Sequence, residues 1–415
     1  MKFKTLVLTA LTLMAGIAQA QQPTWTFEQV LASALASHPA MLGKRSAQAA
    51  ARAEQEGAEW QRYPAFSAEA STQNRSANTD QLGGENAGLV RLEQPLWSGG
   101  RITASIDAAG SRFDAAGAAL DEAKLDLSLR VVAAYTEALR QKARQQHATS
   151  GVREHENLLR MIRRRVEQEV SSLTDQRLAE SRLYQAANDL SLATQALNNA
   201  LAQLAQLSGN PVAEVSVQGV SELGAPADFA AALTQALGWS PVLRRLAHEE
   251  EAANADIASK RSAYMPQLAL RMERSVGQVQ DSRAMLVLTA QPGAGLSAGS
   301  GVDAAIAKRE AARMAREAAE RDARERITLD WNEWVAARLR LENANQSRSI
   351  STEVFESYTR QYVIGRKTWL DVLNAVRETT QSELSAEDAR AQMLAASLRL
   401  RAQGGTLNLN EGTKP

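Results

Sequence analysis

A stretch of roughly 60 residues, from about 101 to 165, contains no strong helix stop and restricts the fold more than any other feature. Its apolar residues recur at spacings of seven, four and three, as in a coiled coil, for example at Leu120, Leu127 and Val131. One helix of this length would extend on the order of 90–100 Å, far beyond the helices of ordinary globular domains. Aromatic residues make up only 5% of the chain. The sequence therefore favours long, closely packed, alanine-rich helices over a bulky globular core.

A second long helical region is interrupted near the C-terminal end by a short turn signal. Gly365 is a poor residue inside a helix and a good C-terminal stop. Thr368 can cap the next helix, with Asp371 three residues later in the positive first turn. The segment therefore predicts a tight turn between two long antiparallel helices.

A weaker copy of this turn lies 196 residues earlier, because 371 − 175 = 196 relates Asp371 to Asp175. Ser172 lies at the start of the helix in the copy, and Glu169 stands in place of the glycine, so that turn is expected to bend differently. Prolines repeat in the same order, with 241 − 39 = 202, 266 − 64 = 202 and 292 − 95 = 197. Ordered matches at nearly one offset predict a duplicated protein.

Each half reads as helix, helix, strand, loop, strand, long helix, turn and long helix. The expected bounds are a signal peptide at 1–20, a first repeat at 21–210, a linker at 211–227, a second repeat at 228–403 and a flexible tail at 404–415. The expected strands are 65–74 and 89–96 in the first repeat and 267–275 and 284–290 in the second. The expected long hairpins are 101–207 and 303–402.

The N-terminal segment has the pattern of a secretory signal peptide. Lys2 and Lys4 precede a short apolar run, and Ala18-Gln19-Ala20 is a small-x-small cleavage site, so we expect cleavage after Ala20. The remaining chain has 45 basic and 47 acidic residues, about −2, which gives no indication of nucleic-acid binding. The absence of cysteine excludes disulfides, thiolate metal sites and an N-terminal lipid anchor on cysteine.

The four predicted strands have a length suited to crossing a bilayer when tilted. Four strands cannot enclose a water-filled barrel, and open strand edges are not tolerated in lipid. We therefore expect an oligomer, and three chains would supply 12 strands.

With these features in place, the sequence resembles the TolC family of outer-membrane channel-tunnels over nearly the whole mature chain. The motifs that carry the resemblance are His38-Pro39, Tyr63-Pro64, Met265-Pro266, the run from Gln94 to Gly100, and the tip segment from Tyr362 to Ala375. The resemblance implies a homotrimer with a 12-stranded β-barrel in the outer membrane, continued by an α-helical tunnel in the periplasm. The fold class expected is thus mainly α with a small β part.

Two segments, from Gln291 to Ala298 and from Tyr362 to Ala375, resemble the LapE/AggA-type members, which serve type I secretion of surface adhesins. This resemblance implies an exit duct for a large or unfolded secreted protein, working with a periplasmic adaptor (membrane fusion protein) and an inner-membrane ATP-binding-cassette (ABC) transporter. One alternative is an outer-membrane duct for multidrug or metal efflux. A second is a periplasmic coiled-coil adaptor or scaffold, which should show a single hairpin within β-rich domains.

The resemblance places the periplasmic gate and the adaptor contact at the tip turns. The residues concerned are Tyr362, Gly365, Arg366, Lys367, Thr368, Leu370, Asp371 and Asn374, together with Ser172 and Asp175 of the first repeat. Asp371 matches the acidic ring of the constriction, while Asn374 replaces a second acidic residue, so one ring of three carboxylates is expected. The simpler alternative is that Asp371 only supports a helix N-terminus. The resemblance implies that Tyr362 and nearby basic side chains hold the entrance shut. Arg366 and Lys367 are the basic candidates for this part, and the alternative for each of them is a solvated charge at a helix end.

The sequence gives no sign of an enzyme. No Ser-His-Asp or paired-carboxylate constellation is present. The four histidines lack metal-ligand spacing, and Ser98-Gly99-Gly100 lacks a phosphate-binding lysine, so no catalytic residue, metal or cofactor is expected. The Arg163-Arg164-Arg165 run is expected to be a solvated helix end or a contact for an acidic adaptor surface.

Overall fold

The computed structural model describes residues 24–72, 86–218, 228–276, 281–291 and 297–407. It is mostly helical with a small sheet, as predicted, and each half runs through two helices, two strands and two long helices. The helices are α1 (Phe27–Ser37), α2 (Pro39–Trp60), α3 (Arg101–Glu167), α4 (Leu173–Ser208), α5 (Phe229–Trp239), α6 (Pro241–Arg261), α7 (Ala298–Val363) and α8 (Trp369–Gln403). The strands are β1 (Thr24–Trp25), β2 (Ala65–Thr72), β3 (Asn86–Trp97), β4 (Glu214–Val215), β5 (Gln267–Val276) and β6 (Asp281–Thr289). The signal-peptide prediction at 1–20 lies outside the described residues.

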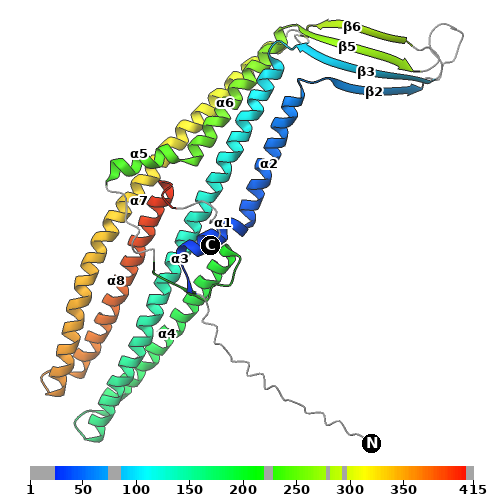
Figure 1. Cartoon of the computed structure of the whole chain (residues 1–415). Helices are drawn as coiled ribbons and strands as arrows, with labels where there is room; N and C mark the ends of the chain where they lie inside the picture. Colours follow the sequence, from blue (N-terminus) through cyan, green and yellow to red (C-terminus); the bar gives the residue numbers. More distant parts are fainter. Residues whose placement is uncertain (1–23, 73–85, 219–227, 277–280, 292–296, 408–415) are drawn as a thin grey trace, which may run out of the picture.

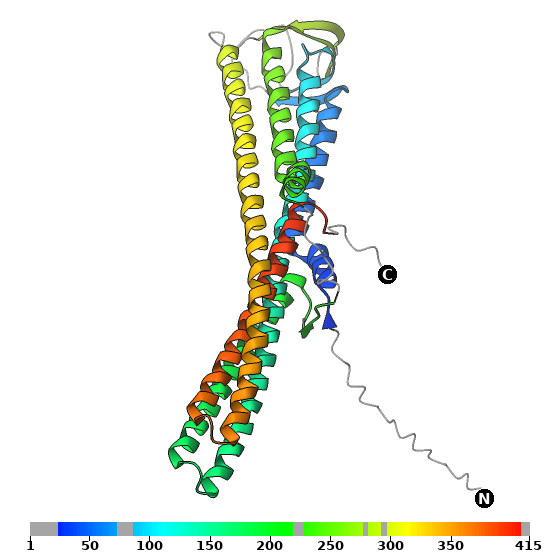
Figure 2. The same cartoon turned by 90° about the vertical axis from the view of Figure 1, so that its left-hand side faces the viewer.

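The long helices form a wall that is one helix thick. Nearer the sheet, the order across the wall is α2, α3, α6 and α7, and nearer the hairpin tips it is α4, α3, α8 and α7. Figure 2 shows α2, α3, α6 and α7 side by side near the sheet. Figure 1 shows the sheet at one end of the wall and the two hairpin turns at the other. The wall therefore has two open edges, with α7 along one edge and α2 followed by α4 along the other.

The sheet is antiparallel in the order β2-β3-β5-β6, which leaves β2 and β6 as its edges. Its register separates two faces: Leu92 pairs with Met272 on an apolar face, and Arg91 pairs with Glu273 on a polar face. Of the large apolar side chains on the first face, Phe66 is 70% exposed and Leu288 is 68% exposed. One face of the sheet is thus apolar and uncovered within the protomer.

Two glycines make the joint between the sheet and α3 possible. Gly99 and Gly100 have φ of 61° and 89°, in the left-handed region that glycine adopts without strain. A Cβ on Gly99 would lie 2.5 Å from Cβ of Met265, which stands at the joint between α6 and β5. The two joints therefore pack against each other closely at this point.

A buried tyrosine on α3 holds β1 and β4 against the middle of the wall. β1 pairs with β4 in parallel, and the hydroxyl of Tyr135 donates to the carbonyls of Trp25 at 2.9 Å and Ser216 at 2.6 Å. Burial raises the pKa of Tyr135 to about 12, although the hydrogen bond to Ser216 opposes the shift. Phe27 packs edge-on against the Tyr135 ring.

Part of the C-terminal tail is ordered by this same core. Leu407 is only 6% exposed and lies in the cluster around Tyr135 and Val131. A Cβ on Gly405 would lie within 2.6 Å of the Trp239 ring. The prediction of a flexible tail from residue 404 is therefore wrong for residues 404–407, because Leu407 packs in the core, Gly405 packs on Trp239 and backbone hydrogen bonds join the segment to the end of α8.

No helix in the described part of the chain is long and apolar enough to cross a membrane.

Candidate functional site at the hairpin tips

The turn between α7 and α8 is built around a left-handed glycine. Gly365 has a φ of 76°, and the N–H groups of Gly365 and Arg366 donate to the carbonyls of Tyr362 at 3.0 Å and Gln361 at 2.9 Å. This pair of bonds satisfies carbonyls that would otherwise be left free at the end of α7. The turn therefore follows the Schellman arrangement.

The turn between α3 and α4 has the same geometry without a glycine. Glu169 has a φ of 59°, and the N–H of Val170 donates to the carbonyl of Arg165 at 2.8 Å. The expectation that Glu169 would make this turn bend differently is wrong. An L-residue can adopt the left-handed conformation at a cost of about 1–2 kcal/mol, which the surrounding hydrogen bonds offset here.

Both return helices begin with the same capping box. Asp371 accepts the N–H of Thr368 at 2.9 Å and its hydroxyl at 2.8 Å, and Asp175 does the same for Ser172 at 3.3 Å and 2.8 Å. The backbone N–H of Thr368, followed by its hydroxyl, lowers the pKa of Asp371 by donating to the carboxylate. Asp371 thus stabilises the N-terminus of α8 in the protomer, whatever else it does in an assembly.

The two hairpins contact each other through aromatic and basic side chains near these turns, which we call the tip clasp: Arg165, Ser171, Tyr362 and Trp369. Arg165 lies over the Tyr362 ring, with Cζ 4.9 Å from the centroid, and its Nε donates to the hydroxyl of Ser171 at 3.3 Å. The hydroxyls of Ser171 and Tyr362 are 3.3 Å apart. The Tyr362 and Trp369 rings are 5.4 Å apart and both are buried.

An apolar cluster supports the tip clasp from below. Leu158 and Ile162 of α3 and Val372 of α8 are at most 1% exposed and pack with Tyr362 and Trp369. The clasp therefore joins α3 to the α7–α8 hairpin by burial as well as by polar contacts.

Arg165 is the functional candidate that sequence reasoning missed. The Arg163–Arg165 run reads as a solvated helix end, and Arg164 is indeed exposed, but Arg165 is half-buried against the other hairpin. Its offset from Gln361 is 196, the same offset that relates the two turns, so it lies at the equivalent helix end, but nothing in the sequence signals its contact with Tyr362.

The other predicted tip residues separate into two groups. Lys367 lies over the Tyr358 ring, with Nζ 4.0 Å from the centroid, so it braces its own hairpin. Arg366, Leu370 and Asn374 are exposed, and Leu370 remains 55% exposed. A cleft of about 390 Å³ separates the two turns, lined by tip-clasp residues, both caps and Leu370. The exposed residues are therefore free to meet a second molecule.

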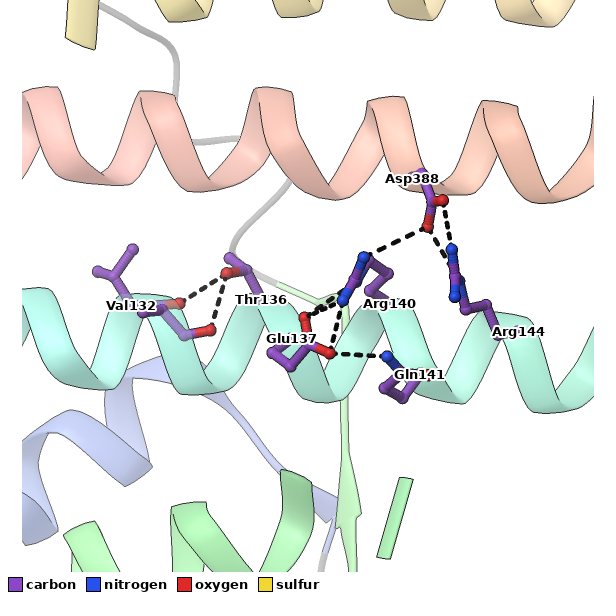
Figure 3. A network of polar contacts seen from close by, with 8 residues as sticks. Val132, Thr136, Glu137, Arg140, Gln141, Arg144 and Asp388 are labelled. Carbon is purple, nitrogen blue, oxygen red and sulfur yellow. Dashed lines mark hydrogen bonds and ion pairs between the residues drawn. The ribbon is translucent and has the colours of Figure 1, made fainter. Parts of the chain in front are cut away.

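Higher in the wall, an ion-pair network connects α3 with α8 (Figure 3). Arg144 donates to both carboxylate oxygens of Asp388, at 3.1 Å and 2.5 Å, and Arg140 lies 3.9 Å from the same carboxylate. Burial alone would raise the pKa of Glu137, but hydrogen bonds from Arg140 and Gln141 lower it below its usual value. This network and the 3.1 Å contact between His147 and Glu383 link α3 to α8 above the tip clasp.

In the part of the chain that the structure covers, no three His, Asp or Glu side chains are placed to hold a metal ion together.

Comparison with known proteins gives a family match and a set of structural relatives. The sequence matches the family described as outer membrane efflux protein over residues 30–210 and 232–406. Curated protein sequences gave no match.

Solved structures with the same fold cover almost the whole chain. The open state of the Neisseria gonorrhoeae MtrE outer membrane channel has a TM-score of 0.78 at 19% identity, covering 93% of this chain and 91% of that one. The outer membrane protein VceC of Vibrio cholerae has a TM-score of 0.77 at 16% identity, covering 91% and 96%. A membrane protein of Pseudomonas aeruginosa has a TM-score of 0.78 at 19% identity, covering 91% and 93%.

Proposed function

The chain belongs to the outer membrane efflux protein family, and from this premise we propose that it is the outer-membrane exit duct of a type I secretion system. It resides in the outer membrane, with its helical part in the periplasm. Members of this family are channels rather than enzymes, and they act as homotrimers with adaptor proteins and inner-membrane pumps.

The observation that carries the proposal is the pair of open edges of the wall. Because the sheet order is β2-β3-β5-β6 and every neighbouring pair is antiparallel, β6 of one copy can pair antiparallel with β2 of the next. Three copies of a four-stranded sheet then give a closed barrel of twelve strands. The same rotation brings α7 of one copy against α2 and α4 of its neighbour.

The helical edges expose apolar side chains suited to such contacts. On α7, Leu329 is 60% and Leu339 59% exposed, and on α4, Tyr184 is 76% and Leu192 56% exposed. Because large apolar side chains are exposed along both edges of the helical wall, contact between neighbouring copies would bury them. A periplasmic adaptor or scaffold finds no support, because the described chain has two hairpins and paired amphipathic strands instead of one hairpin in β-rich domains.

In this proposal the tip clasp keeps the entrance narrow, and the exposed tip residues receive the adaptor. The inner-membrane ABC transporter supplies the energy. Adaptor contact would favour an open arrangement in which the two hairpins of each protomer separate. The cargo would be a large or unfolded secreted protein, as in the type I secretion branch, with multidrug or metal efflux as the second candidate. Gln291–Ala298, one of the two segments that suggested the branch, falls mostly outside the described residues.

Two measurements test the proposal. The mature protein purified in detergent should have the mass of a trimer and should form water-filled pores in a planar bilayer. A stable monomer without conductance would contradict the duct. Deleting the gene should remove a large protein from the cell surface without changing sensitivity to dyes and antibiotics, whereas the reverse outcome would favour the efflux alternative.

A further inference from the structure

One basic residue of the sheet lies on the wrong face for its charge. The charged residues of the described strands lie on the polar face, with a single exception, Arg274. The residues on the polar face are Glu69, Arg91, Glu93, Arg271, Glu273, Asp281 and Arg283. Arg274 shares the opposite face with Leu268, Leu270 and Met272 of its own strand.

The basic residues of the polar face all pair with carboxylates of the same face. Arg91 donates to Glu273 at 2.8 Å, Arg283 donates to the other oxygen of Glu273 at 2.6 Å, and Arg271 donates to Glu93 at 2.8 Å. These cross-strand pairs account for the basic residues of that face in the described strands. Arg274, in contrast, has no charged cross-strand partner.

The sheet register fixes the neighbours of Arg274. Its cross-strand partners are Val90 on β3 and Ser282 on β6, neither of which carries a charge. No described carboxylate forms an ion pair with it, and its side chain is exposed. Because β5 has a strand of this same chain on each side, a neighbouring protomer cannot pair with it directly.

The position of Arg274 along the strand is equally specific. It lies six residues beyond Leu268, which pairs with Trp97 at the joint with the helices, and this spacing is about 20 Å along the strand. The exposed aromatic residue Trp97 is of the type that marks one boundary of a lipid-facing surface. Arg274 lies two residues before the C-terminal end of β5, and Figure 1 shows that β5 ends on the side of the sheet away from the helices.

We propose that Arg274 binds the phosphate group of an anionic membrane lipid at the outer boundary of the lipid-covered face. This inference depends on the proposed barrel, in which the apolar face meets lipid. A charged side chain is strongly unfavourable at the middle of such a face and nearly neutral at its boundary, where phosphates lie. Guanidinium groups pair with phosphate through two parallel hydrogen bonds, and the cross-strand neighbours of Arg274, Val90 and Ser282, offer no carboxylate that would compete.

The test measures lipid retained by the purified trimer. Mature wild-type protein and the variants R274Q and R274K are exchanged into mixed micelles of phosphatidylglycerol and phosphatidylcholine, and the lipid bound per trimer is counted by native mass spectrometry. R321Q is the charge-matched control, because Arg321 is an exposed residue of α7 about 35 Å along the helix from the sheet.

We expect wild type, R274K and R321Q to prefer phosphatidylglycerol, and R274Q to lose the preference by roughly fivefold, the effect of one unit charge near an anionic surface. Equal retention by R274Q and wild type would overturn the inference, and so would displacement of the lipid by millimolar inorganic phosphate, which would indicate a free-phosphate site. If R274Q fails to fold, the wild-type protein alone still tests the inference, because salt screens a charge interaction and its preference for phosphatidylglycerol must fall at high salt. A preference for phosphatidylglycerol that does not depend on salt would overturn the inference as well.

Trimer mass and pore conductance of the wild type are recorded in parallel. Their absence would contradict the duct itself, whereas a conducting trimer without an Arg274-dependent lipid preference would contradict only this inference.

Discussion

The guanidinium of Arg165, at the end of α3, lies over the ring of Tyr362, at the end of α7, with Cζ 4.9 Å from the ring centroid. This is a contact between the two halves of a duplicated chain, made at the point where their hairpins would have to separate if the entrance widened. The hydroxyl of Ser171 lies 3.3 Å from both Arg165 Nε and the Tyr362 hydroxyl, which closes a small polar ring.

Removing either Tyr362 or Arg165 from the tip clasp should weaken the contact between the two hairpins. We expect Tyr362→Ala and Arg165→Ala to increase the resting single-channel conductance of the reconstituted trimer, because each removes a cation–π contact of about 0.5–2 kcal/mol. Tyr362→Phe keeps the ring and should change little. Arg164→Ala, which removes an exposed neighbouring charge, is the matched control. A resting conductance that is the same in all four variants would mean that the clasp does not restrict the pore.

The strained turn gives a prediction about stability. Glu169→Gly should raise the free energy of unfolding of the helical part by about 1 kcal/mol, because glycine adopts the left-handed conformation without the Cβ penalty. Gly365→Ala at the equivalent position should lower it by a similar amount. Thermal or urea unfolding followed by helical circular dichroism measures both. If Glu169→Gly destabilised the protein, the glutamate side chain would have to make a stabilising contact that outweighs the backbone strain.

Asp371 gives a prediction about pH. Its pKa is lowered from the ordinary value of 3.8 by the Thr368 donors, so the folded state binds this proton less readily than the unfolded state. The contribution of the Asp371 carboxylate to the free energy of unfolding is therefore present above pH 3.8 and is lost as the pH falls through the lowered pKa. Thr368→Val, which removes the hydroxyl donor, should shift the titration of the Asp371 carboxyl carbon toward its usual value in an NMR experiment. An unchanged titration would show that the cap does not control the charge.

The same carboxylate tests the pore proposal. If three Asp371 side chains encircle the entrance, Asp371→Asn should lower the cation selectivity measured as a reversal potential in a salt gradient. Asp175→Asn, which removes the equivalent capping carboxylate of the first repeat, separates an effect of capping from an effect of pore charge. Equal selectivity in wild type and Asp371→Asn would leave Asp371 with its capping role alone.

The α3–α8 network should be modestly stabilising. Both carboxylate oxygens of Asp388 are held by Arg144, but the two side chains are 25% and 36% exposed, so solvent screens the pair. A double-mutant cycle of Asp388→Asn and Arg144→Gln should give a coupling free energy of about 0.5–1 kcal/mol. Addition of salt should reduce this coupling. A zero coupling at low salt would show that the packing of α3 on α8 does not need the network.

Tyr135 provides a spectroscopic check of the central core. Its pKa of about 12 means that the folded protein stabilises the neutral phenol, a contribution that is complete below the usual value of 10 and is lost as the pH rises through 12. The ultraviolet titration of tyrosinate should show a component near pH 12 that Tyr135→Phe removes. Loss of the hydroxyl also removes the donor to the Ser216 carbonyl, whereas the Trp25 carbonyl still accepts the N–H of Ser216, so Tyr135→Phe should cost about 1–3 kcal/mol.

Much of the fold was readable because its signals are local. Proline, glycine and capping residues indicate where helices begin and end, and the alternation of Leu92 and Met272 with Arg91 and Glu273 marks the two faces of the sheet. The order of the elements and the tip turns follow from such patterns in the chain alone.

The missed features depend on contacts between distant residues or on tolerated strain. Nothing near Arg165 in the sequence indicates that Tyr362, almost 200 residues later, will lie beside it. As an L-residue, Glu169 disfavours a left-handed turn, yet neighbouring hydrogen bonds hold it in that conformation. The tail was judged by its polar composition, while the packing of Leu407 and Gly405 decides the position of its first residues.

The single-layer arrangement of the helices has a mechanical consequence. In the proposed assembly, the long helices face the transported cargo with one side and the periplasmic partner with the other. Within the described chain, a second layer lies against them only around the middle, where α1, α5 and the β1–β4 pair pack on the wall. A push on the outer surface of α7 or α8 thus displaces the inner lining directly, so a signal from outside needs no relay of intermediate residues to change the bore.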